Sequence, residues 1–249
     1  MSGLVLTHER VDDLQRNGLK IIQNPSAFCF GMDAVLLADF TAVRPGDQVA
    51  DFGTGTGILP VLLSQKDSKA MFYAFEIQKD MADMASRTMA LNGLAHRITV
   101  YGEDLRDAAK AIGHGRMDAV VCNPPYGKQG STLGSESPAL QIARHETGIH
   151  LSEIISAGAA VLRNLGRLSM VFPAARMLEL CDALRSCRME PKRLRMVCAK
   201  ADRAPYLVLL EAMKNARPAL AWQPPLIVYE QDGRETEELQ RIYHRAPGE

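Results

Sequence analysis

The chain has 249 residues, of which 47% are hydrophobic, and its 29 lysines and arginines are balanced by 29 aspartates and glutamates. A chain of this length can bury about 70 to 75% of the surface of its unfolded form, so core size does not limit stability. The formal net charge of zero argues against a histone-like nucleic-acid binder, although a local basic face is compatible with it.

The cysteines and the apolar segments indicate a cytoplasmic protein. The five cysteines are odd in number, scattered and free of any CxxC pair, which disfavours a disulfide framework and a zinc site. No apolar run approaches the ~20 residues of a membrane helix, and acidic residues such as Glu9 and Asp12 near the start are unlike a signal peptide. We therefore expect no metal and no membrane contact, and the sequence leaves the oligomeric state open.

Short β-rich apolar runs alternate with helical segments, which predicts a doubly wound α/β fold with a mostly parallel sheet and helices on both faces. The predicted strands are residues 48–52, 70–76, 98–101, 117–122, 167–172, 193–199 and 206–213. The last two of these seven strands are expected to form an antiparallel pair at the sheet edge. The predicted helices are residues 57–65, 78–91, 105–112, 151–165 and 175–188.

The residues before the first strand contain Asn17-Gly18, a hairpin-turn pair, and a helix-like stretch at 32–40. No Pro/Gly/Ser-rich linker follows them. We therefore expect one domain, with an N-terminal extension at 1–45 that packs near the functional site of the main part, 46–249.

Two further stretches are less regular. Residues 127–141 are rich in glycine, serine and threonine, which predicts a mobile loop. In the tail, 226–229 is expected to be extended and a short helix is expected from Thr236, while the single tryptophan, Trp222, is expected to be a packing anchor.

A glycine-rich segment follows the first predicted strand of the sheet. Gly53, Gly55 and Gly57 alternate with other residues, and Asp51 precedes them by two positions. This spacing differs from the GxGxxG of dinucleotide-binding proteins. Asp51 and the loop carbonyls around Thr54 can receive an ammonium group while the glycines leave room for a chain, which favours S-adenosylmethionine as the ligand.

Two more acidic residues follow the next strands. Glu76 ends the second strand, where a carboxylate can accept hydrogen bonds from both ribose hydroxyls, and Ile77 beside it is placed in the same cofactor set. Asp104 follows the third strand and can accept a bond from the adenine amine, with Leu105 covering the ring edge. Each acid alone would be interpreted as a turn or helix cap. Together with the glycines they predict a cofactor site.

The fourth predicted strand runs into Asn123-Pro124-Pro125-Tyr126. An exocyclic amine or a primary amide is a poor nucleophile, and acceptors on its N–H groups stabilise the positive charge that develops on nitrogen. Asn123 supplies one acceptor, the prolines fix a backbone carbonyl as a second, and Tyr126 can stack on a planar substrate. An isolated tetrapeptide of this kind could equally be a rigid turn. Its place after a strand that neighbours the glycine loop favours the functional interpretation.

These two motifs resemble those of the Rossmann-like class I S-adenosylmethionine-dependent methyltransferases that carry an NPPY motif and methylate adenine, cytosine or glutamine amino groups. A narrower resemblance, over nearly the whole chain, is to the bacterial tRNA1(Val) adenine-37 N6-methyltransferase family. It rests on FCFGMDAVLLA at 28–38, ARHE at 143–146 and PPLIVY at 224–229. The resemblance implies methyl transfer to N6 of an anticodon-loop adenosine, with Phe30 helping to cover the cofactor.

The resemblance leaves alternatives open. Tyr126 is followed by Gly127-Lys128 rather than by another aromatic residue, so a second stacking platform is missing from the motif. Related proteins with NPPY act on a release-factor glutamine, and the motif alone does not separate that amide from an adenine amine. A protein-glutamine N5-methyltransferase and a noncatalytic RNA-binding scaffold therefore remain alternatives.

A basic stretch gives the sequence one candidate contact with RNA phosphates. A solvated face with internal ion pairs is an equal interpretation of it. Arg144 and His145 could touch RNA or close over the site, or could cap the next helix through Glu146. The basic strip consists of Arg185, Arg188, Lys192, Arg193 and Arg195, and Lys200 and Arg203 follow it.

Overall fold

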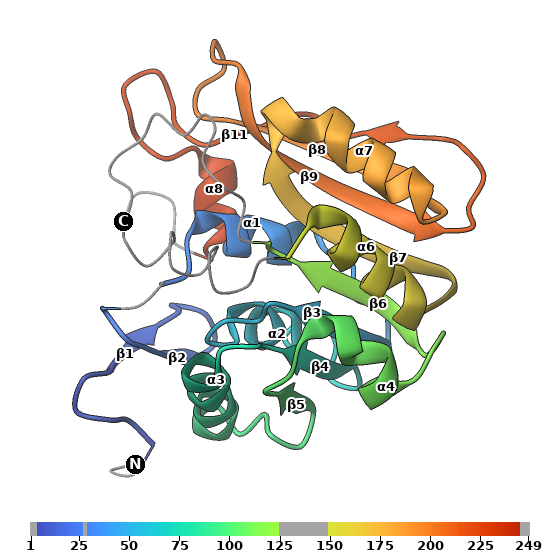
Figure 1. The fold of residues 1–249 in the computed structure, drawn as a ribbon. Helices are drawn as coiled ribbons and strands as arrows, with labels where there is room; N and C mark the ends of the chain where they lie inside the picture. Colours follow the sequence, from blue (N-terminus) through green and yellow to red (C-terminus); the bar gives the residue numbers. More distant parts are fainter. Residues whose placement is uncertain (1–3, 27–28, 125–148, 245–249) are drawn as a thin grey trace.

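The computed structural model describes residues 4–26, 29–124 and 149–244. At its centre is a nine-stranded sheet in the order β10-β8-β9-β7-β6-β3-β4-β5, with β11 also paired to β8 (Figure 1). The strands of this sheet are β3 (Gln48–Phe52), β4 (Met71–Phe75), β5 (Ile98–Tyr101), β6 (Met117–Cys122), β7 (Leu162–Pro173), β8 (Met189–Cys198), β9 (Pro205–Lys214), β10 (Ala221–Trp222) and β11 (Leu226–Ile227).

The strand directions confirm the predicted mostly parallel sheet. Within the described residues, β9 runs antiparallel to both β7 and β8, and the other pairs are parallel. The predicted antiparallel pair is therefore correct, but β9 lies between β7 and β8 rather than at the edge. In the part of the chain that the structure describes, the sheet has nine strands instead of seven, because β10 and β11 are additional strands. Each has only two residues, which is too short for an alternating pattern.

The expected role of Trp222 is wrong. This residue lies in β10 at the free edge of the sheet and is 61% exposed. The strand is held by its backbone, for example by the hydrogen bond from Gln223 N to Leu194 O of 2.8 Å, so the indole ring is not needed for packing.

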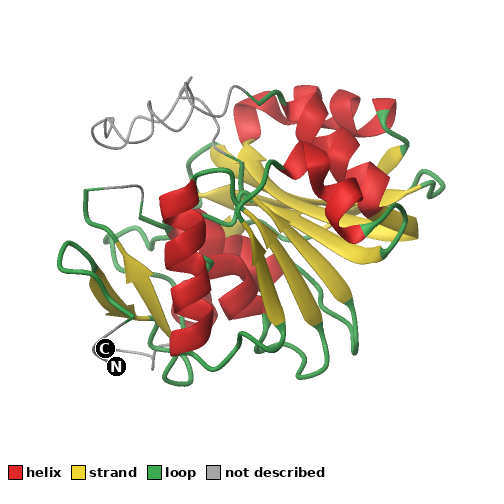
Figure 2. Ribbon diagram, turned by 60° about the horizontal axis from the view of Figure 1, so that its bottom comes forward, coloured by secondary structure: helices red, strands yellow, loops and turns green. Residues whose placement is uncertain are grey.

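Helices cover both faces of the sheet (Figure 2). The helices that pack on one face are α1 (Met32–Phe40), α2 (Ile58–Leu63), α3 (Lys79–Leu91) and α8 (Glu237–Ile242). Those on the other face are α4 (Ala108–Ile112), α6 (Leu151–Val161) and α7 (Met177–Ser186), and the 3-10 helices η1 (Leu105–Asp107) and η2 (Ala174–Arg176) precede α4 and α7. Across the described ranges, no helix is long and apolar enough to cross a membrane.

The central strands are apolar on both faces because both faces are covered. Val49 and Val121 belong to the core cluster beneath α1 and α2, while Ala50 and Val120 belong to the cluster beneath α6. All four residues are fully buried. Successive residues of a strand point to opposite faces, so these runs read as continuous hydrophobic segments in the sequence.

The helix predicted for 151–165 ends four residues early, at Val161, and β7 begins at Leu162. The carbonyls at the end of α6 are bound by other parts of the chain: Gly115 N and Arg116 N donate to Ala160 O and Val161 O at 3.0 and 2.8 Å. Lys214 Nζ donates to Ala159 O and Leu162 O at 2.5 and 2.7 Å. These partners are distant in sequence, so helical periodicity could not reveal the end.

A hairpin precedes the sheet, as Asn17-Gly18 predicted. Its strands β1 (Arg10–Asp13) and β2 (Lys20–Gln23) are antiparallel. Asn17 and Gly18 have φ of 51° and 70°, the positive values of a type I′ turn, and Leu19 N closes it on Arg16 O at 3.0 Å. The guanidinium of Arg16 also donates to Ile242 O at the end of α8, so the hairpin is tied to the last helix.

Candidate functional site

The carboxyl ends of three parallel strands bring the predicted site residues to one edge of the sheet. Phe52 of β3 is in register with Phe75 of β4 and with Cys122 of β6. The residues that directly follow these three strands are therefore at the same level of the sheet, and they are Gly53, Glu76 and Asn123. The predicted adjacency of the first and fourth sheet strands, here β3 and β6, is confirmed.

The loop after β3 has a backbone that needs its glycines. Gly53, Gly55 and Gly57 have φ of 74°, 58° and 92°, a region that other residues adopt only with strain. A Cβ on Gly57 would lie 2.3 Å from Cε of Met89, so this glycine also lets α2 approach α3. The amides of Gly53 and Thr54 both donate to Phe75 O, at 2.9 and 3.0 Å, which holds the loop against β4.

Asp51 lies beneath this loop as a buried acid without a partner. Its side chain is fully buried, and both carboxylate oxygens, like Oγ1 of Thr54, have no hydrogen-bond partner among the described residues. The pKa of Asp51 is raised to about 7, mainly by burial and to a smaller extent by the neighbouring Glu76 carboxylate, while the nearby hydroxyl of Thr54 counteracts the rise. A buried carboxylate is costly unless a cation pairs with it. The position therefore suits a ligand that carries an ammonium group.

Glu76 lies at the end of β4 and is 6% exposed. Its Oε2 accepts the amide N–H of Gly55 at 2.9 Å, and its Oε1 accepts that of Gln78 at 3.0 Å. Burial raises the pKa of Glu76, and these backbone donors counteract the rise. Each carboxylate oxygen retains free acceptor capacity, so the group can still receive two hydroxyl donors.

Asp104 performs the capping role in the structure. It is the N-cap of η1, and its Oδ1 accepts the amide N–H of Arg106 at 2.9 Å. The Arg106 guanidinium also binds this carboxylate, with Nη2 at 2.5 Å from Oδ2, and it lowers the pKa of Asp104. Arg106 in turn pairs with Glu153 of α6 at 3.2 Å. The sequence analysis did not single out Arg106, although its spacing of two from Asp104 is typical of a turn pair.

The smaller predicted cofactor contacts lie near the same edge. Ile77, directly after Glu76, is 40% exposed, which is unusual for an isoleucine at the end of a core strand. Leu105 is partly buried and packs against the core cluster of the α6 face. Phe30 is partly buried in front of α1, and its amide donates to Oε1 of Gln23 at 3.1 Å.

The reacting-base motif is described only in its first half. Asn123 follows β6 and is partly buried, and Pro124 is buried. Pro125 and Tyr126 lie outside the described residues, as do 127–141, Arg144 and His145. The structure therefore places the predicted acceptor Asn123 beside the glycine loop.

The predicted basic strip does not form a single exposed surface. Arg193 pairs with Glu211 at 3.0 Å, and its guanidinium lies 4.0 Å from the centre of the Phe40 ring. Arg195 pairs with Glu238 at 2.7 Å. Two other members of the strip also have partners: Arg185 pairs with Glu190 at 3.0 Å, and Lys192 donates to Arg217 O at 3.1 Å.

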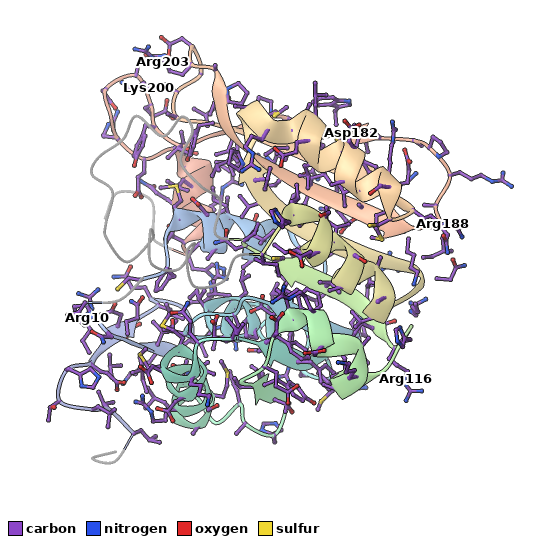
Figure 3. The ribbon with its side chains drawn as sticks, in the orientation of Figure 1. Arg10, Arg116, Asp182, Arg188, Lys200 and Arg203 are labelled. Atoms are coloured by element: carbon purple, nitrogen blue, oxygen red, sulfur yellow. The ribbon has the colours of Figure 1, made fainter. Side chains whose placement is uncertain are left out.

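The two ends of this basic stretch lie at opposite ends of β8. Arg188 comes just before the strand, whereas Lys200 and Arg203 lie in the turn between β8 and β9 (Figure 3). Since β8 is parallel to the strands that carry Asp51 and Asn123, Lys200 and Arg203 belong to the carboxyl edge. Arg188 belongs to the amino edge.

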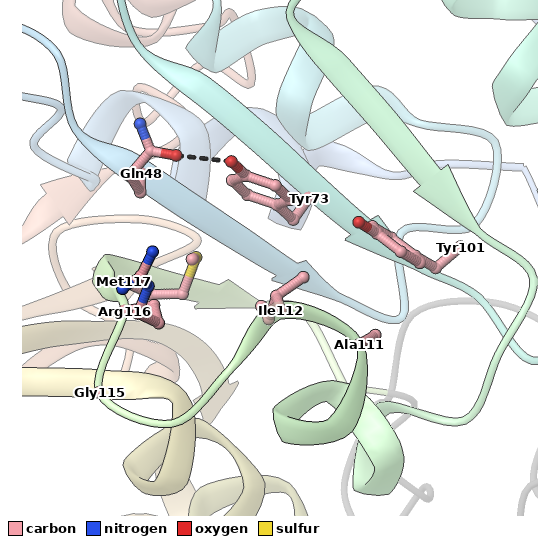
Figure 4. Close-up of a pocket in the computed structure, with 8 residues that line it drawn as sticks. All are labelled: Gln48, Tyr73, Tyr101, Ala111, Ile112, Gly115, Arg116 and Met117. Atoms are coloured by element: carbon pink, nitrogen blue, oxygen red, sulfur yellow. Dashed lines mark hydrogen bonds between the residues drawn. The ribbon is translucent and has the colours of Figure 1, made fainter.

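A cavity of about 560 Å³ lies elsewhere, on the α4 face of β4 (Figure 4). Gln48 and Met117, the first residues of β3 and β6, line it, and Tyr73 donates its hydroxyl hydrogen to Oε1 of Gln48 at 2.6 Å. None of its lining residues belongs to the predicted cofactor or base motifs. The cavity is therefore separate from the chemistry predicted at the carboxyl edge.

Comparisons with known proteins agree with this arrangement. Residues 18–190 match the family model described as Methyltransferase small domain. A Tolumonas auensis protein named tRNA1(Val) (adenine(37)-N6)-methyltransferase is 30% identical over 228 residues, which cover 88% of this chain and 90% of that protein. A protein of the same name from Pasteurella multocida is 26% identical over 208 residues, covering 82% and 83%.

Solved structures share the fold. A predicted O-methyltransferase from Agrobacterium tumefaciens, protein Atu636, superposes with a TM-score of 0.70 at 22% identity, covering 86% of this chain and 96% of that one. TYW2 from Pyrococcus horikoshii, in complex with MeSAdo, has a TM-score of 0.58 at 16% identity, covering 85% and 73%. The predicted class I methyltransferase fold and the predicted resemblance are confirmed, and the chain belongs to the methyltransferase small domain family.

Proposed function

We propose that this protein transfers a methyl group from S-adenosylmethionine to the exocyclic N6 amine of an adenosine in tRNA, the anticodon-loop A37 of a valine tRNA. One observation supports it most directly. The carboxylate of Asp51 is buried under the glycine loop, and the described residues supply no hydrogen-bond partner for it. Asp51 lies in β3, the neighbour of β6, and β6 runs into Asn123-Pro124. The choice of substrate is based on the relatives that carry the tRNA1(Val) name and match the chain over most of its length.

The residues of the glycine loop fit this cofactor. Asp51 would hold its ammonium group, which removes the cost of a lone buried charge. Glu76 would bind the ribose hydroxyls through the acceptor capacity that Gly55 and Gln78 leave free. Gly53, Thr54 and Gly57 shape the loop around the chain of the ligand.

The adenine end of the cofactor has apolar and polar candidates. Exposed Ile77 and half-buried Leu105 would contact the ring, and Phe30 would close the site from the N-terminal extension 1–45. Asp104 would accept a hydrogen bond from the adenine amine through an oxygen lone pair that Arg106 does not use.

The cofactor, when bound, supplies an electrophilic methyl group on a sulfonium. The carboxamide oxygen of Asn123 accepts one N–H of the substrate amine, and the carbonyl of Pro124 accepts the other. Both acceptors stabilise the positive charge that develops on nitrogen as the N–C bond forms. Tyr126 and the fixed ring of Pro125 complete the motif by holding the base flat. As the nitrogen gains the methyl group, the bond between that carbon and the donor sulfur breaks, and the sulfur leaves as a neutral thioether with the electron pair. The methylated nitrogen afterwards loses one proton to water, so no strong general base is required.

The proposal includes contact with the tRNA backbone and a cytoplasmic location. Of the basic strip, Arg193 and Arg195 are held in ion pairs within the fold, which leaves Arg185, Arg188 and Lys192 as its more accessible members. These three lie toward the amino edge of the sheet, whereas the reacting base is expected at the carboxyl edge, so we expect them to contact tRNA phosphates away from that base.

The test is transfer of tritium from labelled S-adenosylmethionine into total tRNA and, separately, into release factor. The proposal predicts label in tRNA, recovered as N6-methyladenosine. Label in release factor alone would show the glutamine N5-methyltransferase instead. Binding of RNA without cofactor binding would show the noncatalytic scaffold. In each assay the Asp51→Ala variant is the control that lacks the cofactor carboxylate.

A further inference from the structure

The carboxyl edge of the sheet has an exposed aromatic residue that the NPPY motif does not include. Tyr206 is the second residue of β9 and is 39% exposed. Leu207, next to it, is in register with Pro173 at the end of β7, and β7 is the neighbour of β6. Tyr206 is therefore two strands from β6, or about 10 Å at ordinary strand spacing, and it lies three residues beyond the level of Asn123 at the same edge of the sheet.

The ring of Tyr206 is anchored at one end. Its hydroxyl lies 4.0 Å from Sδ of Met32 at the start of α1. Burial raises the pKa of this phenol, and the nearby carboxylate of Asp33 raises it further, so the hydroxyl stays neutral. A side chain with a fixed polar end and an exposed ring is a suitable stacking surface, since little conformational entropy is lost when a base packs on it.

Two basic residues lie in the turn that leads into this strand. The turn from Lys200 to Arg203 joins β8 to β9 and precedes Tyr206 by three residues. Lys200 donates to Gln231 O at 3.0 Å, which fixes its position, and Asp202 accepts Nε2 of Gln231 at 3.4 Å. Arg203 is exposed and forms no ion pair with any residue of the described ranges. The labelled positions of Lys200 and Arg203 in Figure 3 show both at the end of β8 opposite Arg188.

From this juxtaposition we infer that Tyr206, Lys200 and Arg203 form a docking surface for single-stranded RNA, on which the base next to the methylated adenosine stacks while the basic turn contacts the adjoining phosphates. An exposed aromatic ring beside basic side chains is the arrangement that recognises unpaired nucleotides. The inference rests on the proposed function, because it places the second stacking platform that the residues after Tyr126 lack.

The experiment measures binding of a fluorescein-labelled valine tRNA anticodon stem-loop by anisotropy, with the full-length protein and saturating S-adenosylhomocysteine. Tyr206→Leu is expected to raise the Kd about tenfold, in line with a base-stacking contact, whereas Tyr206→Phe keeps the ring and is expected to stay within about twofold. Trp222→Leu is the matched control, since that ring is more exposed but lies on the free edge of the sheet. It is expected to leave the Kd unchanged.

The basic turn is tested by its salt dependence. The double variant Lys200→Gln, Arg203→Gln is expected to reduce the slope of log K against log salt by about 1.4, which corresponds to two phosphate contacts on a single strand. The comparison pair Arg185→Gln, Arg188→Gln, at the other end of β8, is expected to change it by less than about 0.5. The affinity of every variant for S-adenosylhomocysteine should match that of the wild-type protein.

The outcomes separate this inference from the proposed function. If the wild-type protein methylates tRNA while the Tyr206→Leu and double glutamine variants bind RNA as the wild-type does, the docking surface is refuted and the proposed function stands. A loss of binding in the Arg185, Arg188 pair alone would place the RNA on the basic strip and also refute it. If the wild-type protein binds the stem-loop through these residues but labels only release factor, the surface stands and the proposed function fails. Should Tyr206→Leu unfold, the double glutamine variant still decides.

Discussion

The backbone amide of Gly55 donates a hydrogen bond of 2.9 Å to Oε2 of Glu76, which ties the glycine loop after β3 to the end of β4. The same carboxylate raises the pKa of Asp51 across the loop. Residues expected to hold opposite ends of one cofactor are therefore coupled before it binds.

Asp51→Asn is expected to stabilise the free protein at pH 8 while it weakens cofactor binding. The folded-state pKa of Asp51 is about 7, above its ordinary value of 3.8, so the folded form binds more protons than the unfolded form between about pH 4 and 7. Stability therefore falls as pH rises through that window. Asparagine has no such cost. The Tm of the variant should exceed that of the wild-type by several degrees at pH 8 and match it near pH 4; a lower Tm at pH 8 would contradict the argument.

Cofactor affinity is expected to fall as pH decreases below 7. The ammonium of S-adenosylmethionine pairs with the ionised form of Asp51, and the free protein holds this group protonated below its pKa of about 7. Isothermal titration calorimetry should show the Kd rising by up to about tenfold per pH unit from pH 6.5 to 5.5, with proton release on binding. The Asp51→Asn variant should lose the part of this dependence that Asp51 causes. A wild-type Kd that does not change over this range would exclude the pairing.

Gly57→Ala is expected to destabilise the protein by about 1 to 3 kcal/mol, the usual range for a non-glycine residue held in the left-handed region. Its φ is 92°, and the new Cβ would also meet Cε of Met89. Gly46→Ala is the matched control, because its φ of 76° brings the same kind of strain with no atom within 4 Å. Urea denaturation should show the larger loss for Gly57→Ala. An equal loss of unfolding free energy in the two variants would mean that the contact of the new Cβ with Met89 adds nothing to the backbone strain.

Arg193→Glu is expected to lower stability rather than act on RNA affinity. Glutamate at this position would face Glu211, would lose the hydrogen bond to Phe40 O of 2.8 Å and would lose the stack on the Phe40 ring. Breaking such a half-buried pair costs about 2 kcal/mol or more. Thermal denaturation should therefore show a Tm lowered by several degrees, with little change in the RNA KM at a temperature where the variant is folded. Full stability with a raised KM would restore Arg193 to the predicted basic strip.

The sequence was sufficient where local pattern and function coincide. The spacing of Gly53, Gly55 and Gly57 after a buried strand predicted both the turn and the cofactor loop, and Asn17-Gly18 predicted the hairpin. In these segments the backbone conformation depends on residues close in sequence. The parallel pairing of β3 with β6 also followed from the alternation of strands and helices.

Features that depend on distant residues were not predictable in this way. The end of α6 is set by Gly115, Arg116 and Lys214, and the position of β9 inside the sheet is set by pairing with β7. The basic stretch is continuous in the sequence, but β8 separates Arg185 and Arg188 at its start from Lys200 and Arg203 beyond its end. Between them, Arg193 and Arg195 are held in ion pairs within the fold. Tyr206 gave no signal, because an aromatic residue at the start of a strand is ordinary until the strand order places it at the same edge of the sheet as Asn123.

The central claim is that Asn123 accepts the substrate amine beside a bound sulfonium donor. It is tested most directly by single-turnover transfer of tritiated methyl to tRNA by Asn123→Ala, with cofactor affinity measured on the same preparation. We expect a cofactor Kd within about threefold of the wild-type and a transfer rate lowered by at least about 100-fold, as for loss of a group that stabilises developing charge. A transfer rate equal to that of the wild-type would contradict it.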